Sequence, residues 1–203
     1  MQKQSFQHLP ILYRPYDFPA SYPVLAFIGS YWKNTCNVPE FLHFHNAIEI
    51  GYCLDGSGQI YWGESDCFSC RSGDYCIIFP QVPHIVVNDS VINSWEYLYV
   101  EPKLFLQKEG FSCDLLWQIF YIPQKVPVVV SRDKYPLLHL YISKIFREFH
   151  EKKILYQRAV HGLLIAFLAE INRITLRGSA EGGFQKETVS AYKYICTALE
   201  YIY

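Results

Sequence analysis

The sequence predicts a mainly β domain, a sandwich or barrel, followed by two amphipathic helices. From Val24 to about Glu101, short runs rich in β-branched and aromatic residues are separated by turn signals about every 8–12 residues. After Val130 the apolar residues instead recur at a spacing close to 3.6, which is typical of helices. At 203 residues, the chain can form one good-sized core, or one domain with an appendage.

The composition is that of a folded protein without a strong net charge. Hydrophobic residues make up 51% of the chain, and 18 Lys plus Arg face 19 Asp plus Glu. This balance provides no net field for a polyphosphate and argues against nucleic-acid binding by these residues. No apolar run approaches the ~18 residues of a membrane span, and the N-terminus lacks the apolar segment of a signal peptide. The seven cysteines show no paired spacing, which indicates reduced thiols and a cytoplasmic protein.

The β-rich part is expected to have an extended arm in front of it. Residues 1–23 carry four prolines among scattered aromatics and predict no regular element. Residues 24–131 are expected to form the barrel. Within the run Ile48–Leu54, the even positions are bulky and apolar, and the odd positions share a face with His43 and His45 if the strand runs on unbroken. Both faces then need cover, one from the barrel interior and the other from a helix or partner.

Residues 132–177 are expected to form two amphipathic helices joined near residues 152–155. Their apolar positions are Leu138, Tyr141, Ile142, Ile145, Phe146 and Phe149 in the first helix, and Leu163, Leu164, Phe167, Leu168, Ile171 and Ile174 in the second. Residues 178–186 contain several glycines and a serine, which predict a flexible linker. Residues 187–203 begin a further helical pattern that reaches Tyr203 without a stop signal, as in a helix that continues beyond it.

A cluster of metal-ligand residue types is the main candidate site. His43 and His45 lie on one face of a strand, about 7 Å apart by strand rise. Glu49 follows on the next inward position, and His84 comes from a later hairpin. Three neutral imidazoles and one carboxylate suit Zn, Ni, Mn or Fe and leave coordination positions open for a ligand.

This layout resembles the two motifs of the cupin barrel. The first motif is the segment FLHFHNAIEIGYCLDGSG, which ends near Gly56. The second is GDYCIIFPQVPHIVVN, which keeps the cupin separation of Gly73 from His84 and the spacing of His84 from Asn88. The resemblance implies a double-stranded β-barrel in which the three histidines and Glu49 form a polar lining.

The second motif departs from the cupin pattern. The family has Pro six residues after the glycine and Gly two residues beyond it, whereas this chain has Phe79 and Gln81, with Pro80 one residue late. Two interpretations of the four-residue cluster therefore stay open. It is either a metal site or a polar pocket in which the same residues hydrogen-bond a ligand or each other.

Together with its flanking segments, the barrel is similar to the N-terminal sensor domain of AraC-family transcription regulators. In that family the barrel binds a small effector, often a sugar or related metabolite, and the following helices form a homodimer. In the arabinose-binding member a proline-bearing arm folds over the pocket. Residues 195–203 are similar to the start of the first DNA-binding helix. The resemblance implies a non-enzymatic protein that contacts DNA only through a C-terminal domain missing from this sequence.

The resemblance also indicates further pocket residues. By motif position, Trp95 and Tyr97 correspond to lining residues on the last barrel strand. Together with Tyr99 they share one face of residues 94–100. Aromatic rings suit a sugar or flat metabolite, and they equally suit the packing of a barrel interior.

The sequence leaves two dimer seams and three functions open. Two apolar stripes are candidate seams: Leu138, Ile142, Ile145 and Phe149, or Leu164, Phe167, Leu168 and Ile171. The rival function is a small metal-dependent cupin enzyme, a dioxygenase or sugar isomerase, with the metal on the histidines and Glu49. The departure in the second motif and the linker argue against this rival. A third possibility is a dimerisation module with a vestigial pocket.

Overall fold

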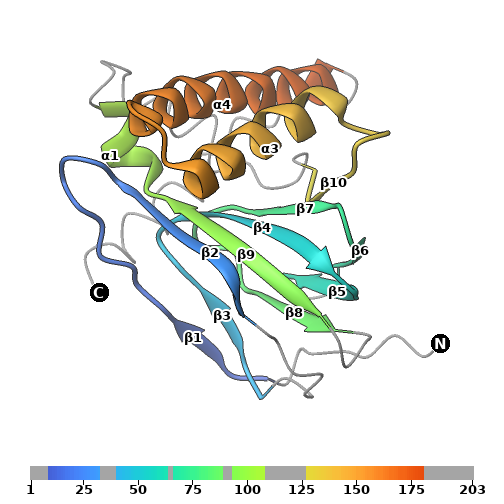
Figure 1. Ribbon diagram of the computed structural model, residues 1–203. Helices are drawn as coiled ribbons and strands as arrows, with labels where there is room; N and C mark the ends of the chain where they lie inside the picture. Colours follow the sequence, from blue (N-terminus) through green and yellow to red (C-terminus); the bar gives the residue numbers. More distant parts are fainter. Residues whose placement is uncertain (1–8, 33–39, 64–65, 89–92, 108–126, 181–203) are drawn as a thin grey trace.

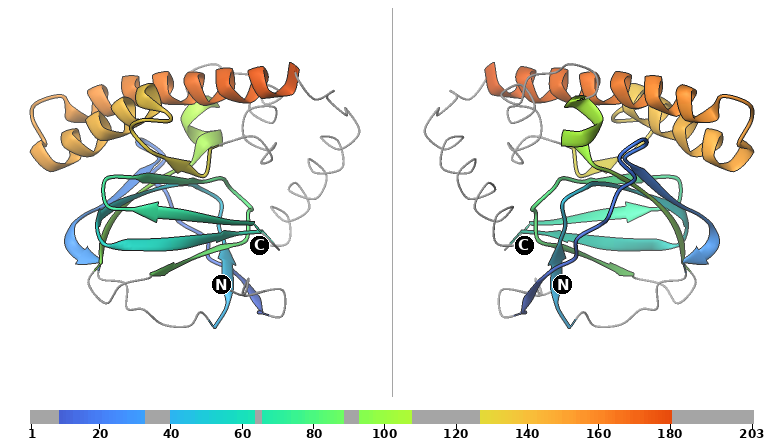
Figure 2. Two further views of the ribbon diagram at one scale, coloured as in Figure 1. Left: turned by 90° about the vertical axis from the view of Figure 1, so that its right-hand side faces the viewer. Right: turned by 90° about the vertical axis from the view of Figure 1, so that its left-hand side faces the viewer.

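The computed structural model of the chain describes residues 9–32, 40–63, 66–88, 93–107 and 127–180. In these ranges, two five-stranded sheets face each other and helices lie across the outer side of one sheet (Figure 1). Figure 2 shows the same layers from two sides, with the other sheet farthest from the helices. The predicted cupin-type barrel followed by helices is confirmed. The predicted DNA-binding start at residues 187–203 lies outside the described residues.

The elements are as follows. The first sheet has the order β1 (Ile11–Tyr13), β3 (Leu42–Phe44), β8 (His84–Asn88), β5 (Ser57–Trp62) and β6 (Asp66–Arg71). The second sheet has the order β10 (Val129–Val130), β7 (Tyr75–Ile78), β4 (Ile48–Asp55), β9 (Ser94–Val100) and β2 (Val24–Trp32). The helices are α1 (Pro102–Gln107), α3 (Pro136–Glu151) and α4 (Tyr156–Ala180). No helix among the described residues combines the length and apolar character needed to cross a membrane.

Alternation along β4 decides which side chains line the barrel. Glu49 pairs with Tyr99 of β9 and points into the barrel, whereas the ring of Tyr52 points to the helices and lies 5.7 Å from the ring of Phe146. Gly51 sits on the inner face, where an added Cβ would come within 2.6 Å of the Cys76 sulfur. Both faces of β4 are therefore covered, as the sequence predicted.

The strand does not run on unbroken from the histidines to Glu49. β3 belongs to the first sheet and β4 to the second, and residues 45–47 between them are not in a strand. The chain bends there because it crosses from one sheet to the other. His45 nevertheless turns inward, with its ring 5.6 Å from the ring of Tyr99.

The N-terminal arm is more regular than predicted. Residues 11–13 form β1, which runs parallel to β3 and completes the edge of the first sheet. The amide of Arg14 donates to the carbonyl of Phe44 at 2.9 Å. An exposed edge strand offers unpaired backbone groups to any extended segment, and here the arm takes that place.

The two helices bury the stripes that the sequence assigned to a dimer seam. Ile145 of α3 and Phe167 of α4 are both fully buried within this single chain. The other stripe residues are buried as well: Leu138, Ile142, Phe149, Leu164, Leu168 and Ile171. The outer face of the second sheet is apolar and takes this cover itself, so both seam predictions are wrong. The outward apolar residues on α3 are instead Leu137 and Leu140, which are 40% and 45% exposed.

One helix boundary differs from the prediction, and one short helix was not predicted. α4 continues through Gly178 to Ala180, so the first residues of the predicted linker are helical, and residues 181–186 lie outside the described part of the chain. The short helix α1 was not predicted. Its first amides, at Lys103 and Leu104, donate to the Glu101 carboxylate, and a proline follows this acid at the first helical position.

Candidate metal and effector site

The four predicted ligand residues meet between the two sheets. His43 of β3 and His84 of β8 are directly opposite each other in the antiparallel register. Glu49 reaches them from β4 in the other sheet, and His45 comes from the bend between β3 and β4. One candidate ligand atom of each residue lies within 4.8 Å of the corresponding atoms of the other three. We call these four residues the His/Glu cluster.

The cluster is centred on one carboxylate oxygen. Glu49 Oε2 lies 3.0 Å from His45 Nε2 and 3.5 Å from His84 Nε2. All three of these side chains are buried. The rings of His43 and His84 are 4.3 Å apart between centroids. Three imidazoles and a carboxylate thus share a volume that bulk water does not fill.

The opposite nitrogens of two imidazoles are already committed as donors. Nδ1 of His45 lies 2.9 Å from the Ala47 carbonyl, and Nδ1 of His84 lies 2.8 Å from the Val82 carbonyl. A carbonyl only accepts, so each Nδ1 carries a proton. In the neutral imidazole, Nε2 then presents a lone pair, and in both residues this lone pair faces the Glu49 carboxylate.

Burial disfavours the charged forms of His43 and His45. It lowers the pKa of His43 to about 3, with neighbouring His84 adding to the effect. Burial likewise lowers the pKa of His45, although the contact with Glu49 acts in the opposite direction. Burial alone would raise the pKa of Glu49, but its contacts with His45 and His84 outweigh burial and hold that pKa well below its usual range. An ionised Glu49 carboxylate therefore lies beside two imidazoles, His43 and His45, whose charged forms burial disfavours.

These residues fit a divalent metal. Lone pairs on the imidazoles and negative oxygens repel one another unless a cation lies between them. Nδ1 of His43 and Nε2 of His84 are buried and have no hydrogen-bond partner among the described residues. Metal-ligating histidines usually donate their second ring nitrogen to a carbonyl, which is the pattern seen at His45 and His84. A mixed nitrogen and oxygen set suits Zn, Ni, Mn or Fe.

An aromatic wall runs along β9 away from the cluster. Trp95, Tyr97 and Tyr99 stack in sequence, with ring centroids 6.1 and 6.3 Å apart. Trp95 is completely buried, and its indole donates to Asn88 Oδ1 at 3.2 Å. Of the two predicted lining residues, Trp95 therefore packs the barrel interior, and Tyr97 lies between it and the cluster.

Two residues beside the cluster were not predicted as site residues. Tyr99 lies nearest to it on β9 and was noticed in the sequence only as part of the aromatic face. Tyr16 comes from the arm, and its ring lies 4.2 Å from the ring of Tyr99 and 5.6 Å from that of His45. Alternation along β9 could have indicated Tyr99, but no local signal in the arm indicates Tyr16.

The family model that describes the AraC-like ligand binding domain matches residues 37–168, which include β3 to β9, the His/Glu cluster and most of the helices. This chain belongs to that family. No curated protein sequence matches it significantly.

Several solved structures share a distant likeness with the AraC-like domain. The AraC-like transcriptional activator CuxR is 12% identical with a TM-score of 0.37, over 71% of this chain and 55% of that one. Oxalate decarboxylase from Bacillus subtilis at pH 4.6 is 18% identical with a TM-score of 0.27, over 36% of this chain and 18% of that one. A further structure of that enzyme, concerned with its Mn(II) centres, is 13% identical with a TM-score of 0.27, over 44% and 29%. The chain thus spans about half of CuxR and much less of the enzyme, and these distant likenesses carry no argument about chemistry.

Acid is expected to destabilise the metal-free AraC-like domain partly through His43. Its pKa of about 3 in the folded state lies below the ordinary 6.5, so the unfolded chain binds more protons between these values. This contribution to stability is complete above the ordinary pKa and is lost as the pH falls toward 3. Urea unfolding at about pH 7 and about pH 5 should therefore show a smaller fall in midpoint for His43→Asn than for the wild type. Equal falls would contradict the prediction.

Proposed function

We propose that this AraC-like domain senses a small effector inside the barrel, beside the His/Glu cluster, and thereby controls attached DNA-binding domains. The match to the family of AraC-like ligand binding domains supports the sensor role. The observation that supports this position is the set of buried, unpartnered ring nitrogens at His43 and His84. A soluble metabolite with hydroxyl or carbonyl oxygens, such as a sugar, has the acceptors and donors that this cluster and the tyrosine hydroxyls beside it can use.

The proposal includes a divalent metal held by the three histidines and Glu49. When bound, the metal would supply a Lewis-acidic position for an effector oxygen. The protein supplies the other contacts. Tyr99 and Tyr16 lie against His45, so their rings limit the size of an effector and exclude water from the cluster.

The arm would act as the cover of this site. The amide of Tyr16 donates to Asn46 Oδ1 at 2.9 Å, and Asn46 Nδ2 donates back to the Tyr16 carbonyl at 3.1 Å. These two bonds and β1 tie the arm to the bend that carries His45. An effector that changes the affinity of the arm for the barrel would shift the regulator between states, provided that it binds those states unequally.

Asn46→Ala is expected to loosen the arm without unfolding the barrel. Loss of two partly buried hydrogen bonds costs about 1–3 kcal/mol locally, so the amide of Tyr16 should exchange with deuterium about tenfold to a hundredfold faster. Ser69→Ala, on an exposed position of β6, is the matched control and should leave exchange in the arm unchanged. Unchanged protection of Tyr16 in Asn46→Ala would contradict the cover role.

We also propose that the domain forms a homodimer through the helices, with the outward face of α3 as the contact surface. The exposed apolar residues Leu137 and Leu140 of α3 replace the buried stripes as the candidate contacts. Clustered apolar side chains on a surface are typical of interaction sites.

The proposed sensor role is tested by titration of the purified domain. The metal-free protein would first be loaded with Zn, Ni, Mn or Fe and then titrated with a panel of sugars and related metabolites in a thermal-shift assay. An effector at about a hundred times its Kd should stabilise the fold by about 2.7 kcal/mol. Failure of the panel together with turnover of a substrate by the metal-loaded protein would support the cupin enzyme instead.

A further inference from the structure

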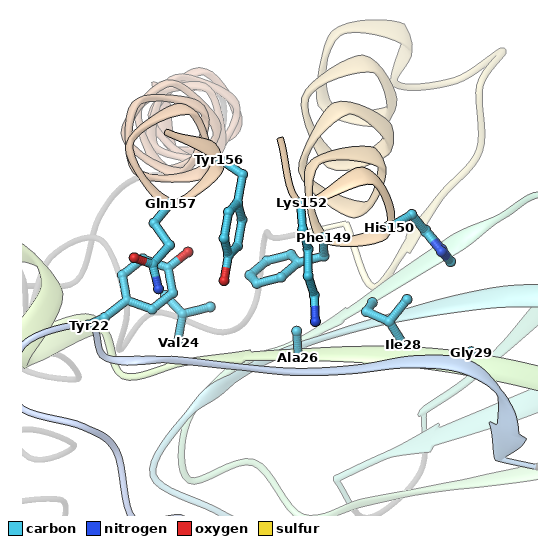
Figure 3. A pocket seen from close by; sticks show the side chains of 10 residues that line it. All are labelled: Tyr22, Val24, Ala26, Ile28, Gly29, Phe149, His150, Lys152, Tyr156 and Gln157. Carbon is cyan, nitrogen blue, oxygen red and sulfur yellow. The ribbon is translucent and has the colours of Figure 1, made fainter. Parts of the chain in front are cut away.

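A pocket lies outside the barrel, between β2 and the connection from α3 to α4 (Figure 3). Its volume is about 580 Å³, in the range of small-molecule sites. None of the residues that line it belongs to the His/Glu cluster or to the aromatic wall of β9. A ligand of this pocket would therefore be distinct from an effector in the barrel.

The floor of the pocket is apolar. Val24, Ala26 and Ile28 are alternate residues of β2, so their side chains share the face that points to the helices. Phe149 of α3 closes the inner side. The small side chain of Ala26 in the middle of this row leaves room for a flat or aliphatic group. Burial of such a group against these four side chains is the apolar part of binding.

One end of the pocket gathers uncharged polar groups. Tyr22 lies there beside Tyr156 and Gln157, at the start of α4 (Figure 3). The hydroxyl of Tyr22 is buried and has no hydrogen-bond partner among the described residues. Burial raises the pKa of Tyr22, with Tyr156 adding to the effect, so this hydroxyl keeps its proton and can donate it. Buried hydroxyls are nearly always bonded, and a ligand acceptor would satisfy this one.

Lys152 places a positive charge over the middle of the apolar floor. The side chain of Lys152 extends from the connection toward β2 and places its ammonium group above Ala26 (Figure 3). Lys152 makes no ion pair with any residue that the structure describes, whereas the next residue, Lys153, pairs with Glu151 at 2.8 Å. The backbone of Lys152 is left-handed, with φ of 44°, which an L-residue adopts at a cost. This conformation ends α3 and aims the side chain along the pocket.

The charge nearby limits the ligand to one negative group. Glu96 is buried under His150, and its carboxylate accepts from His150 Nε2 at 2.8 Å and from the Gly29 amide at 2.7 Å. Gly29 and His150 both line the pocket. A second anionic group on the ligand would lie near this carboxylate with only one lysine to balance it, and such an unbalanced charge is unfavourable.

We propose that this outer pocket binds a small aromatic carboxylate with one polar group opposite the acid. The carboxylate pairs with Lys152 above Ala26, the ring rests on Val24 beside Phe149, and the far group accepts from Tyr22. The walls of the outer pocket come from β2 and from both helices. A bound ligand therefore adds contacts between the barrel and the helical layer.

The test uses 3-(4-hydroxyphenyl)propionate as the probe and its neutral amide as the comparison, titrated into the whole domain by calorimetry. The acid should bind saturably with a Kd below about 1 mM and more tightly than the amide. Lys152→Met should weaken acid binding about tenfold and remove the preference over the amide. The matched control Lys153→Met should bind like the wild type, because that lysine does not line the pocket.

Two more variants locate the probe. Ala26→Phe fills the pocket and should abolish binding, while His45→Ala, in the barrel, should leave binding unchanged. Circular dichroism checks that each variant is folded; if Ala26→Phe is not, Tyr22→Phe serves in its place and should weaken binding about tenfold.

Several results would overturn the proposal. The first is that the wild type shows no saturable binding of the acid. The second is that Lys152→Met and Lys153→Met weaken acid binding equally. The third is that acid binding is lost in His45→Ala but kept when the outer pocket is filled. The last result would place the probe in the barrel, which leaves the proposed sensor role intact and removes only the outer site.

Discussion

Glu49→Gln is expected to weaken divalent-metal binding by the His/Glu cluster at least about a hundredfold, since it removes the only negative ligand while keeping the shape of the side chain. If the cluster is a metal site with neutral imidazoles, the same change should leave the metal-free protein at least as stable as the wild type. A glutamine amide can donate to the Nε2 lone pair of His45, which the carboxylate at 3.0 Å cannot do. Metal binding would be followed by titration and elemental analysis, and stability by urea unfolding with a chelator present.

This pair of measurements separates the two interpretations of the cluster. If it were a metal-free ion pair, Glu49→Gln would strand a buried imidazolium and destabilise the fold by about 3–5 kcal/mol. Glu96→Gln is the matched control, because Glu96 is also a buried carboxylate in contact with a histidine. It should leave metal affinity unchanged. A wild-type protein that binds none of the four metals, together with a strongly destabilised Glu49→Gln, would refute the metal site.

Ile145→Ala is expected to destabilise the single chain by about 2–5 kcal/mol, because it opens a cavity under α3 where the side chain is fully buried. The loss should be the same at every protein concentration, since the residue packs within the chain and not against a second copy. Chemical unfolding at several concentrations measures both the size of the loss and its independence of concentration.

Leu140→Ala tests the outward face of the same helix. Its side chain is 45% exposed, so the substitution should change the unfolding free energy of the monomer by less than about 1 kcal/mol. If the outward face of α3 forms the proposed dimer, this variant should shift sedimentation toward the monomer while Ile145→Ala does not. A shift in Ile145→Ala alone would restore the buried stripe as the seam.

The amino-acid pattern predicted the architecture, and the resemblance to the cupin motifs indicated the four cluster residues. Period-two runs with regular turns predict a barrel, and the later change to a helical period predicts α3 and α4, because backbone geometry determines which side chains share a face. Strand periodicity alone could not have joined His43 to Glu49, because the chain bends at residues 45–47 and crosses between the two sheets.

Only the tertiary structure decided where the apolar stripes pack and what closes the site. A helix stripe is equally suited to its own sheet or to a second copy, and the apolar outer face of β4 and β9 takes it here. Tyr16 reaches His45 because the arm adds β1 to a sheet edge, a long-range pairing with no local signal. The outer pocket likewise depends on how the connection after Lys152 lies over β2, since segments far apart in sequence form it.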